Sequence, residues 1–218
     1  MIRLAVFDCD GTLIDSQANI CLAMEEAFAQ SGIVAPTRAS IRRIVGLSLV
    51  EAVAALLPDA EDALHAHVAA DYKRAFQGMR ARGQVDEPLF EGIAELLDTL
   101  RDGGWLLGVA TGKSDRGLAH VLDHHGLTGH FVSLQTADRH PSKPHPSMLH
   151  SAMAEAGADP LGTVVIGDTS FDIAMALNAR TRAVGVTWGY HDSADLVRAG
   201  AHAIARRPAD LVALLEVA

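Results

Sequence analysis

Two aspartates follow directly on the first apolar run of the chain. Residues 2–7 are mostly apolar, and the stretch "DCDGTLID" comes after them, with carboxylates at Asp8, Asp10 and Asp15. Carboxylates this close in sequence repel one another when they are ionised, so gathering them in one place requires compensating positive charge. We therefore expect a lysine, an arginine or a metal ion to lie opposite these carboxylates in the folded protein.

Further polar residues stand where other apolar runs end. Thr111 closes "WLLGVAT", Asp168 closes "TVVIGD" with Asp172 four residues later, and Lys143 lies in "SKPHP" before a helical pattern. In an open α/β sheet the carboxyl ends of the strands meet at one crevice, so we expect these side chains to converge there. A group of carboxylates suits a hard divalent cation such as Mg²⁺. The expected metal ligands are Asp8, Asp10, Asp168 and Asp172.

The second half of the chain alternates short apolar runs with amphipathic segments. The apolar runs predict buried strands at 105–111, 131–136, 163–168 and 181–188, in addition to the strand at the amino terminus. The segments between them predict helices at 91–102, 114–125, 145–156 and 170–178. This alternation predicts the α/β class, with a doubly wound, mostly parallel sheet.

The segment 16–82 has a different pattern. It is rich in Ala, Leu and Glu, its apolar residues recur at helical spacing, and it contains no convincing strand. A linker-like stretch, "RGQVDEP", follows at 82–88. We therefore expect an α/β domain formed by 1–15 and 83–218, and a small all-helical domain, 16–82, inserted after the first strand. Such an insertion would hang over the carboxyl edge of the sheet as a cap.

Composition limits the classes of partner. The formal charge of −9 argues against a nucleic-acid partner, because no basic stripe is available to displace counterions from phosphates. No apolar stretch approaches the length of a membrane span, so no membrane partner is expected. The two cysteines, Cys9 and Cys21, form no disulfide framework and indicate a reducing compartment. These features predict a cytoplasmic protein; they leave the oligomeric state open.

Four motifs in order give the chain a family resemblance. They are "DCDGTLID", Thr111 in "VATGK", Lys143 in "SKP", and "GDTSFD". Together with the predicted helical insertion, they resemble the haloacid dehalogenase-like hydrolase superfamily, with its Rossmann-like core. The stretches "GLSLVEAV" (46–53) and "GVTWGY" (185–190) are similar to segments of the phosphoglycolate phosphatase-like members.

The resemblance implies a phosphatase with an aspartyl-phosphate intermediate. Asp8 would be the nucleophile, and Asp10 would protonate the leaving alcohol and then deprotonate the attacking water. Thr111 and the Gly112 amide would bind phosphoryl oxygens, and Lys143 would neutralise charge on them. Mg²⁺ would be the cofactor, held by the aspartates named above. The implied substrate is a small phosphorylated metabolite, with 2-phosphoglycolate as the first candidate.

Residues of the expected cap are candidates for substrate selection. By the same resemblance, the loop Gly46-Leu47-Ser48 reaches the active site, where Ser48 would contact substrate and Arg43 would bind a substrate carboxylate. Two neighbours of the motifs are expected to play no chemical part. Thr12 is expected to make a local hydrogen bond within its loop, and Lys113 to begin a helix and face solvent.

Two alternatives to the phosphatase remain. The first is a β-phosphoglucomutase-like phosphotransferase, which would need polar sugar-binding residues in the cap; the stretch "EAVAALL" (51–57) is rich in Ala and Leu and disfavours it. The second is a non-catalytic phospho-acceptor or binding protein. Since all four motifs keep their reactive residues, we favour the enzyme.

Overall fold

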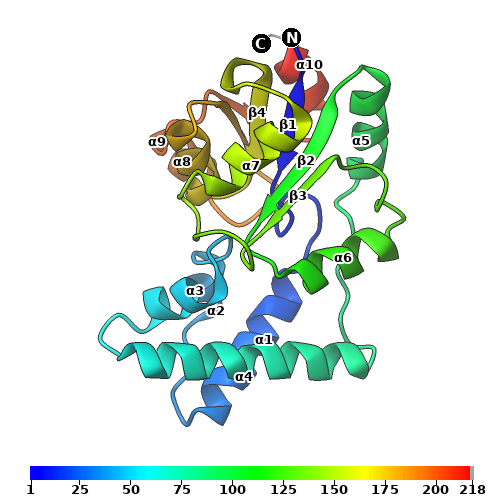
Figure 1. Cartoon of the computed structure of the whole chain (residues 1–218). Helices are drawn as coiled ribbons and strands as arrows, with labels where there is room; N and C mark the ends of the chain where they lie inside the picture. Colours follow the sequence, from blue (N-terminus) through cyan, green and yellow to red (C-terminus); the bar gives the residue numbers. More distant parts are fainter. Residues whose placement is uncertain (217–218) are drawn as a thin grey trace.

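A computed structural model describes residues 1–216 and shows a six-stranded, fully parallel sheet in the order β3-β2-β1-β4-β5-β6 (Figure 1). The first strand is central, so the loop that follows it emerges at the middle of the carboxyl edge. The strands are β1 (Leu4–Phe7), β2 (Leu106–Thr111), β3 (Ser133–Thr136), β4 (Thr163–Gly167), β5 (Arg182–Val186) and β6 (Ala203–Ala205).

Helices cover both faces of this sheet. One face packs against α5 (Ile93–Asp102), α6 (Asp115–His124) and α10 (Asp210–Glu216), and the other against α7 (Ser147–Ala156), α8 (Ser170–Asn178) and α9 (Ser193–Arg198). A 3₁₀ turn, Pro160–Gly162, precedes β4. Because β1 and β4 are buried on both faces, their sequences are continuous apolar runs. The doubly wound α/β fold predicted from the sequence is confirmed.

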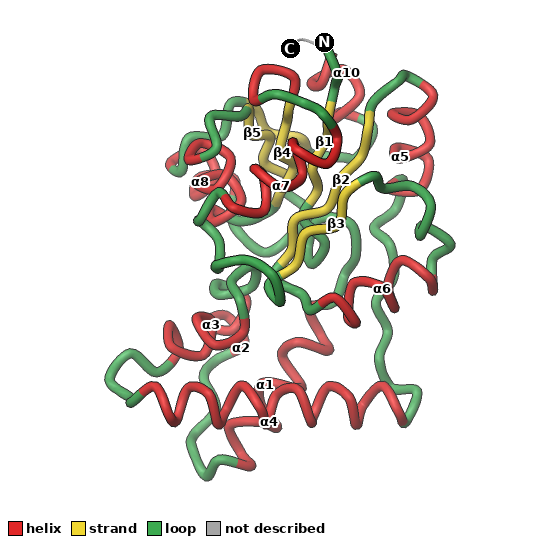
Figure 2. Tube along the Cα trace, viewed as in Figure 1, coloured by secondary structure: helices red, strands yellow, loops and turns green. Residues whose placement is uncertain are grey.

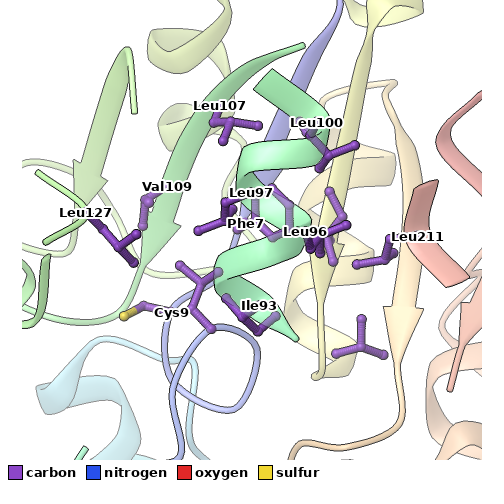
Figure 3. Close-up of a cluster of buried hydrophobic side chains, with 14 of the residues drawn as sticks. Phe7, Cys9, Ile93, Leu96, Leu97, Leu100, Leu107, Val109, Leu127 and Leu211 are labelled. Atoms are coloured by element: carbon purple, nitrogen blue, oxygen red, sulfur yellow. The ribbon is translucent and has the colours of Figure 1, made fainter. Parts of the chain in front are cut away.

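The larger core cluster lies under α5. Figure 3 shows Ile93, Leu97 and Leu100 of this helix packed against Phe7 of β1 and Leu107 of β2. The apolar residues of α5 recur at helical spacing and so form one buried face. Cys9 belongs to the same cluster, which shows that the side chain between Asp8 and Asp10 points into the core and away from the crevice.

Four helices lie beyond the carboxyl ends of β1 and β2, as Figures 1 and 2 show. They are α1 (Gln17–Gln30), α2 (Arg38–Arg42), α3 (Leu49–Leu56) and α4 (Asp62–Ala81). Helix α1 packs along α4, and the four share a hydrophobic cluster of their own that includes Met24, Phe28, Val53 and Val68. We call these four helices and their connections the helical layer; the exact domain boundaries at 15/16 and 82/83 stay a prediction. No helix within residues 1–216 is both long and apolar enough to cross a membrane.

Candidate active site

The loop after β1 brings its two aspartates to the same edge of the sheet. The Asp8 amide continues the β ladder by donating to the Ile166 carbonyl at 2.9 Å, which fixes the start of the loop. Gly11 then adopts a φ of +89°, and a Cβ at this position would collide with the Asp168 carboxylate. A glycine is therefore required for the turn. The chain turns back at once, so Asp8 and Asp10 stay at the crevice.

Three of the four predicted metal ligands come together. Asp8, Asp168 and Asp172 each offer a carboxylate oxygen, and these oxygens lie within 4.8 Å of one another in a buried group. Lys143 is also fully buried and donates from Nζ to Asp8 Oδ1 and to Asp172 Oδ1, each at 2.7 Å. Three carboxylates thus face one ammonium group. We call these four residues the carboxylate cluster.

Neighbouring donors hold two of the aspartates in place. Asp168 Oδ1 accepts a hydrogen bond from Thr12 Oγ1 at 2.8 Å, and Asp168 Oδ2 accepts one from the Tyr190 amide at 2.8 Å. Asp172 closes the capping box of α8, where its Oδ2 accepts from the hydroxyl and the amide of Thr169. The expected local bond of Thr12 is therefore wrong, because its hydroxyl reaches a different strand end.

The electrostatics of the carboxylate cluster favour binding of a cation. Burial raises the pKa of Asp8 to about 7, although the charge of Lys143 opposes this rise. Burial and the charge of Asp8 raise the pKa of Asp168. Burial alone would lower the pKa of Lys143, but the charges of Asp172 and Asp8 raise it above its usual value. One oxygen, Asp8 Oδ2, is buried without any hydrogen-bond partner among residues 1–216.

These residues fit a magnesium ion. The donors are carboxylate oxygens, which Mg²⁺ prefers, and the negative charge of the cluster exceeds what Lys143 compensates. The unpartnered Asp8 Oδ2 is the kind of buried polar atom that a cation satisfies. Asp8, Asp168 and Asp172 are the residues that would hold the ion.

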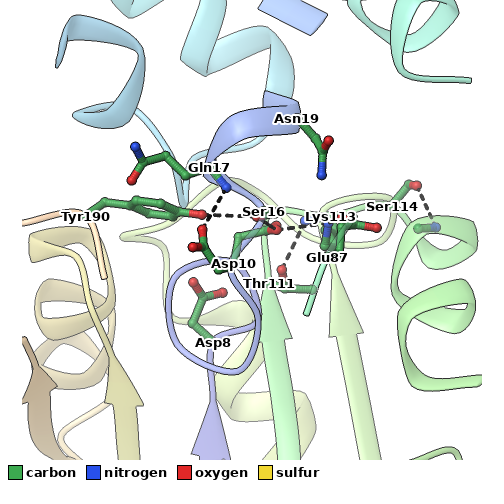
Figure 4. Close-up of polar contacts among 12 residues, drawn as sticks. Asp8, Asp10, Ser16, Gln17, Asn19, Glu87, Thr111, Lys113, Ser114 and Tyr190 are labelled. Carbon is green, nitrogen blue, oxygen red and sulfur yellow. Dashed lines mark hydrogen bonds and ion pairs between the residues drawn. The ribbon is translucent and has the colours of Figure 1, made fainter. Parts of the chain in front are cut away.

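The carboxylate of Asp10, the fourth predicted ligand, lies elsewhere. It pairs with Lys113, whose Nζ is 2.9 Å from Asp10 Oδ1, and it accepts a hydrogen bond from Ser16 (Figure 4). The prediction that Lys113 faces solvent is wrong: its side chain is only 10% exposed, and its Nζ also lies 2.8 Å from Glu87 Oε1. The carboxylate of Asp10 is thus not part of the cluster.

Thr111 and Gly112 line a cavity next to both aspartates of the loop. The cavity has a volume of about 850 Å³ and lies between the sheet edge and the helical layer. Thr111 is buried, and its Oγ1 accepts from the Lys113 amide at 3.1 Å, which leaves its own proton free to be donated. A Cβ on Gly112 would lie 2.6 Å from the Leu47 carbonyl, so the close approach of the helical layer requires glycine here.

The two predicted residues of the helical layer have different positions. Ser48 lines the cavity; its amide donates to Ser142 Oγ at 2.8 Å, and its own hydroxyl oxygen is buried without a partner among the described residues. Arg43 does not line the cavity. Its side chain is 73% exposed and lies 3.5 Å from Asp195. The structure therefore brings Ser48 to the site and leaves Arg43 outside it.

Comparison with known proteins identifies the family. The family model for haloacid dehalogenase-like hydrolases matches residues 5–186, which is most of the chain. The chain belongs to this family. Among curated proteins, this hydrolase is 35% identical over 199 residues to "Probable phosphatase IndB" of Dickeya dadantii, covering 90% of this chain and 86% of that protein.

Two other relatives of this hydrolase extend the comparison. It is 31% identical to a phosphoglycolate phosphatase of Agrobacterium fabrum, over 87% of this chain and 82% of that one. A hydrolase from Pseudomonas syringae superposes with a TM-score of 0.87 at 26% identity, covering 100% of this chain and 99% of that chain. The family and the phosphatase relatives together support a phosphatase enzyme.

Sequence reasoning missed several residues of this hydrolase's site. Lys113 was overlooked as the partner of Asp10, and Glu87 as a second partner of Lys113. Thr169 and Tyr190 were overlooked as donors to aspartates of the carboxylate cluster. One signal was available for Thr169, because Thr-x-x-Asp at the start of a helix is a capping-box pattern. Glu87 lies in a polar linker where nothing in the sequence distinguishes it from a solvated residue.

Proposed function

We propose that the chain is a Mg²⁺-dependent phosphatase that hydrolyses a small phosphomonoester through an aspartyl phosphate on Asp8. The observation that carries this proposal is the unpartnered, buried Asp8 Oδ2. It lies in a cluster with two more buried carboxylates and Lys143, and Asp8 lines the cavity. Lys143 holds the Asp8 carboxylate in one orientation at the cavity, which suits it to nucleophilic attack on phosphorus.

The first half-reaction transfers the phosphoryl group to the protein. A carboxylate oxygen of Asp8 attacks phosphorus, the bond from phosphorus to the ester oxygen breaks, and the departing oxygen takes a proton from Asp10. The Thr111 hydroxyl and the Gly112 amide donate to the phosphoryl oxygens, and Lys143 keeps Asp8 oriented. Mg²⁺, when held by the three carboxylates, supplies positive charge that offsets repulsion between nucleophile and phosphate.

The second half-reaction restores the enzyme. Asp10, ionised after it has given up its proton, takes a proton from a water molecule as that water attacks phosphorus. The bond between phosphorus and the Asp8 oxygen breaks, and inorganic phosphate leaves. One residue serves as acid and then as base because the two steps alternate. The helical layer would act as a cap that excludes bulk water during the transfer.

The cavity wall formed by the helical layer is of mixed character. It contains the apolar side chains of Ile44, Leu47, Leu49 and Phe76, and also the polar side chains of Ser48, Glu51, Lys73, Gln77 and Arg80. Relatives named as phosphatases favour hydrolysis over transfer to a sugar. We take 2-phosphoglycolate as the first substrate to test, because a relative carries that name.

A carboxylate on the substrate would not be bound by Arg43. Arg80 and Arg116 line the cavity, and Arg80 Nε is buried without a hydrogen-bond partner within residues 1–216. Arg80 is therefore the better candidate to bind an anionic leaving group. The cytoplasmic location expected from the sequence stays a prediction; both cysteines are free thiols in buried positions.

Phosphate release from a panel of esters tests the proposed function. The panel contains 2-phosphoglycolate, sugar phosphates and nucleotides, assayed with Mg²⁺ and again with EDTA. We expect release that requires Mg²⁺ and is unchanged in an Arg43→Ala variant, whose altered side chain lies outside the cavity. Release that persists in EDTA would contradict the metal dependence, and no release from any ester would contradict the phosphatase itself.

A further inference from the structure

We propose that Lys113 is a positioning residue for Asp10. It anchors one oxygen of the Asp10 carboxylate, so that the other oxygen is presented to the leaving group of the substrate. This inference rests on the proposed function, in which Asp10 exchanges the proton. It assigns a task to a lysine for which the sequence motifs predict none.

Both contacts of the Asp10 carboxylate use the same atom. Lys113 Nζ lies 2.9 Å from Oδ1, and the hydroxyl of Ser16 donates to Oδ1 as well (Figure 4). Within residues 1–216 no group donates a hydrogen bond to Oδ2. Asp10 lines the cavity, and so does Lys113. The carboxylate is therefore divided into an anchored oxygen and an oxygen that is free to carry the proton.

Lys113 is itself held from several sides. Its Nζ lies 2.8 Å from Glu87 Oε1 and 5.9 Å from the centre of the Phe76 ring. Arg80 of α4 donates to the second oxygen of Glu87 at 2.8 Å, and its guanidinium also lies over Phe76. These bonds restrict the four-carbon side chain of Lys113, which would otherwise be flexible.

The charges around Asp10 are balanced. When Asp10 is ionised, Asp10 and Glu87 carry two negative charges and Lys113 and Arg80 two positive ones; the side chains of all four are at most about a quarter exposed. We call these four residues the balanced network. Because the network has no excess charge, it requires no metal ion. Its contacts can instead fix the direction in which the Asp10 carboxylate points.

The chemistry of the leaving group gives a test that separates positioning from a merely structural role. An alkoxide is a poor leaving group and needs a proton as it departs, whereas p-nitrophenolate leaves readily without one. A misdirected Asp10 therefore slows cleavage of an alkyl ester and spares cleavage of an aryl ester. Loss of general folding or of phosphate binding slows both esters alike.

The experiment compares 2-phenylethyl phosphate with p-nitrophenyl phosphate, two esters of similar size, in the Mg²⁺-loaded enzyme. For Lys113→Met we expect kcat/KM to fall by about 10²-fold with the alkyl ester, the scale of general acid catalysis. With the aryl ester we expect a loss of less than about threefold. Lys113→Arg, which keeps the charge, should recover part of the alkyl activity. Arg101→Met, which removes an exposed cation on α5, is the matched control and should change neither value.

Equal losses on both esters, or no loss on either, would overturn the role of Lys113. If Lys113→Met does not fold, as judged by circular dichroism, then Ser16→Ala removes the other anchor and must show the same selectivity for the alkyl ester. Asp10→Asn separates the two proposals. If Asp10→Asn is selective and the anchor variants are not, only the further inference fails. If Asp10→Asn is unselective, the acid role of Asp10 fails, and the role of Lys113 fails with it.

Discussion

The crevice contains two groups of acidic side chains with opposite charge balance. In the carboxylate cluster, Asp8, Asp168 and Asp172 face Lys143 alone, and all four side chains are almost fully buried. In the balanced network, Asp10 and Glu87 face two cations, one from the sheet edge and one from the helical layer. Two residues of a single loop, Asp8 and Asp10, thus lie in different electrostatic surroundings.

This difference in charge balance indicates which chemical role suits each group. Burying three carboxylates beside one ammonium group is unfavourable, and the raised pKa values of Asp8 and Asp168 express that cost. Such a site gains when a divalent cation binds. A balanced group gains nothing from a cation, but its ion pairs fix the orientation of the side chains. We therefore propose that the first group holds the metal ion and the nucleophile and that the second group provides a positioned proton donor.

The largest effect is expected from Asp8→Asn. The amide is nearly the same size as the carboxylate but cannot form an aspartyl phosphate, so turnover should fall by at least about 10⁴-fold. The fold should persist, because the change also removes one of three crowded negative charges. Phosphate release and circular dichroism measure the two results. Turnover above one percent of the wild-type rate would contradict the assignment of Asp8 as nucleophile.

A smaller effect, on thermal stability, distinguishes the carboxylate cluster from the balanced network. Mg²⁺ at a hundred times its dissociation constant should stabilise the fold by about 2.7 kcal/mol. For a chain of this length, we expect a rise in Tm of about 5–10 °C. Asp168→Asn should lose most of this rise, whereas Asp10→Asn should keep it, because the carboxylate of Asp10 lies outside the cluster. Thermal unfolding with Mg²⁺ and with EDTA measures the shift. An equal loss in both variants would remove the distinction.

The smallest effect concerns Tyr72, a partly buried residue of α4 next to the balanced network. Burial raises its pKa above the usual value of 10, and the charges of Asp10 and Glu87 add to the rise while that of Lys113 opposes it. The folded protein then keeps a proton that the unfolded chain releases above pH 10. The free energy of unfolding should consequently fall with pH there, by up to about 1.4 kcal/mol per pH unit.

Urea unfolding between pH 8 and pH 11 measures this dependence. Tyr72→Phe has no phenol to ionise, so its stability should fall less steeply above pH 10 than that of the wild type. Below pH 9 the two curves should run parallel, since the phenol is neutral in both states there. Identical slopes above pH 10 would show that Tyr72 titrates normally and that its surroundings are well hydrated.

Much of the fold was predictable because buried parallel strands are continuous apolar runs. The segments around β1, β2, β4 and β5 were identified from this pattern. The strand β6, Ala203–Ala205, was not, because three residues are too few to show any period. Helix α3 was not separated from its neighbours, since the Ala- and Leu-rich stretch gives helical spacing without marking where one helix ends.

The candidate site was predictable where it follows strand ends. Asp8, Thr111 and Asp168 were placed correctly at the carboxyl edge because parallel strands must deliver their last residues there. Arg43 was expected at the cavity on resemblance alone, and its side chain instead lies beside Asp195 on the surface. The direction of a side chain at the end of a short helix depends on packing, which the local pattern does not contain.

By itself, the sequence determined which residues could do chemistry, because residue type and position after an apolar run are local properties. Only the tertiary structure decided which of these charged side chains form ion pairs with one another. Asp8 and Asp10 are two residues apart, yet Lys143 pairs with the first and Lys113 with the second. Glu87 and Arg80 complete the second group, and both lie about seventy residues or more after Asp10 in the chain. Such pairing depends on distances across the folded molecule: the two lysines reach the aspartates once the sheet has formed, and Arg80 joins once the helical layer has packed against its edge.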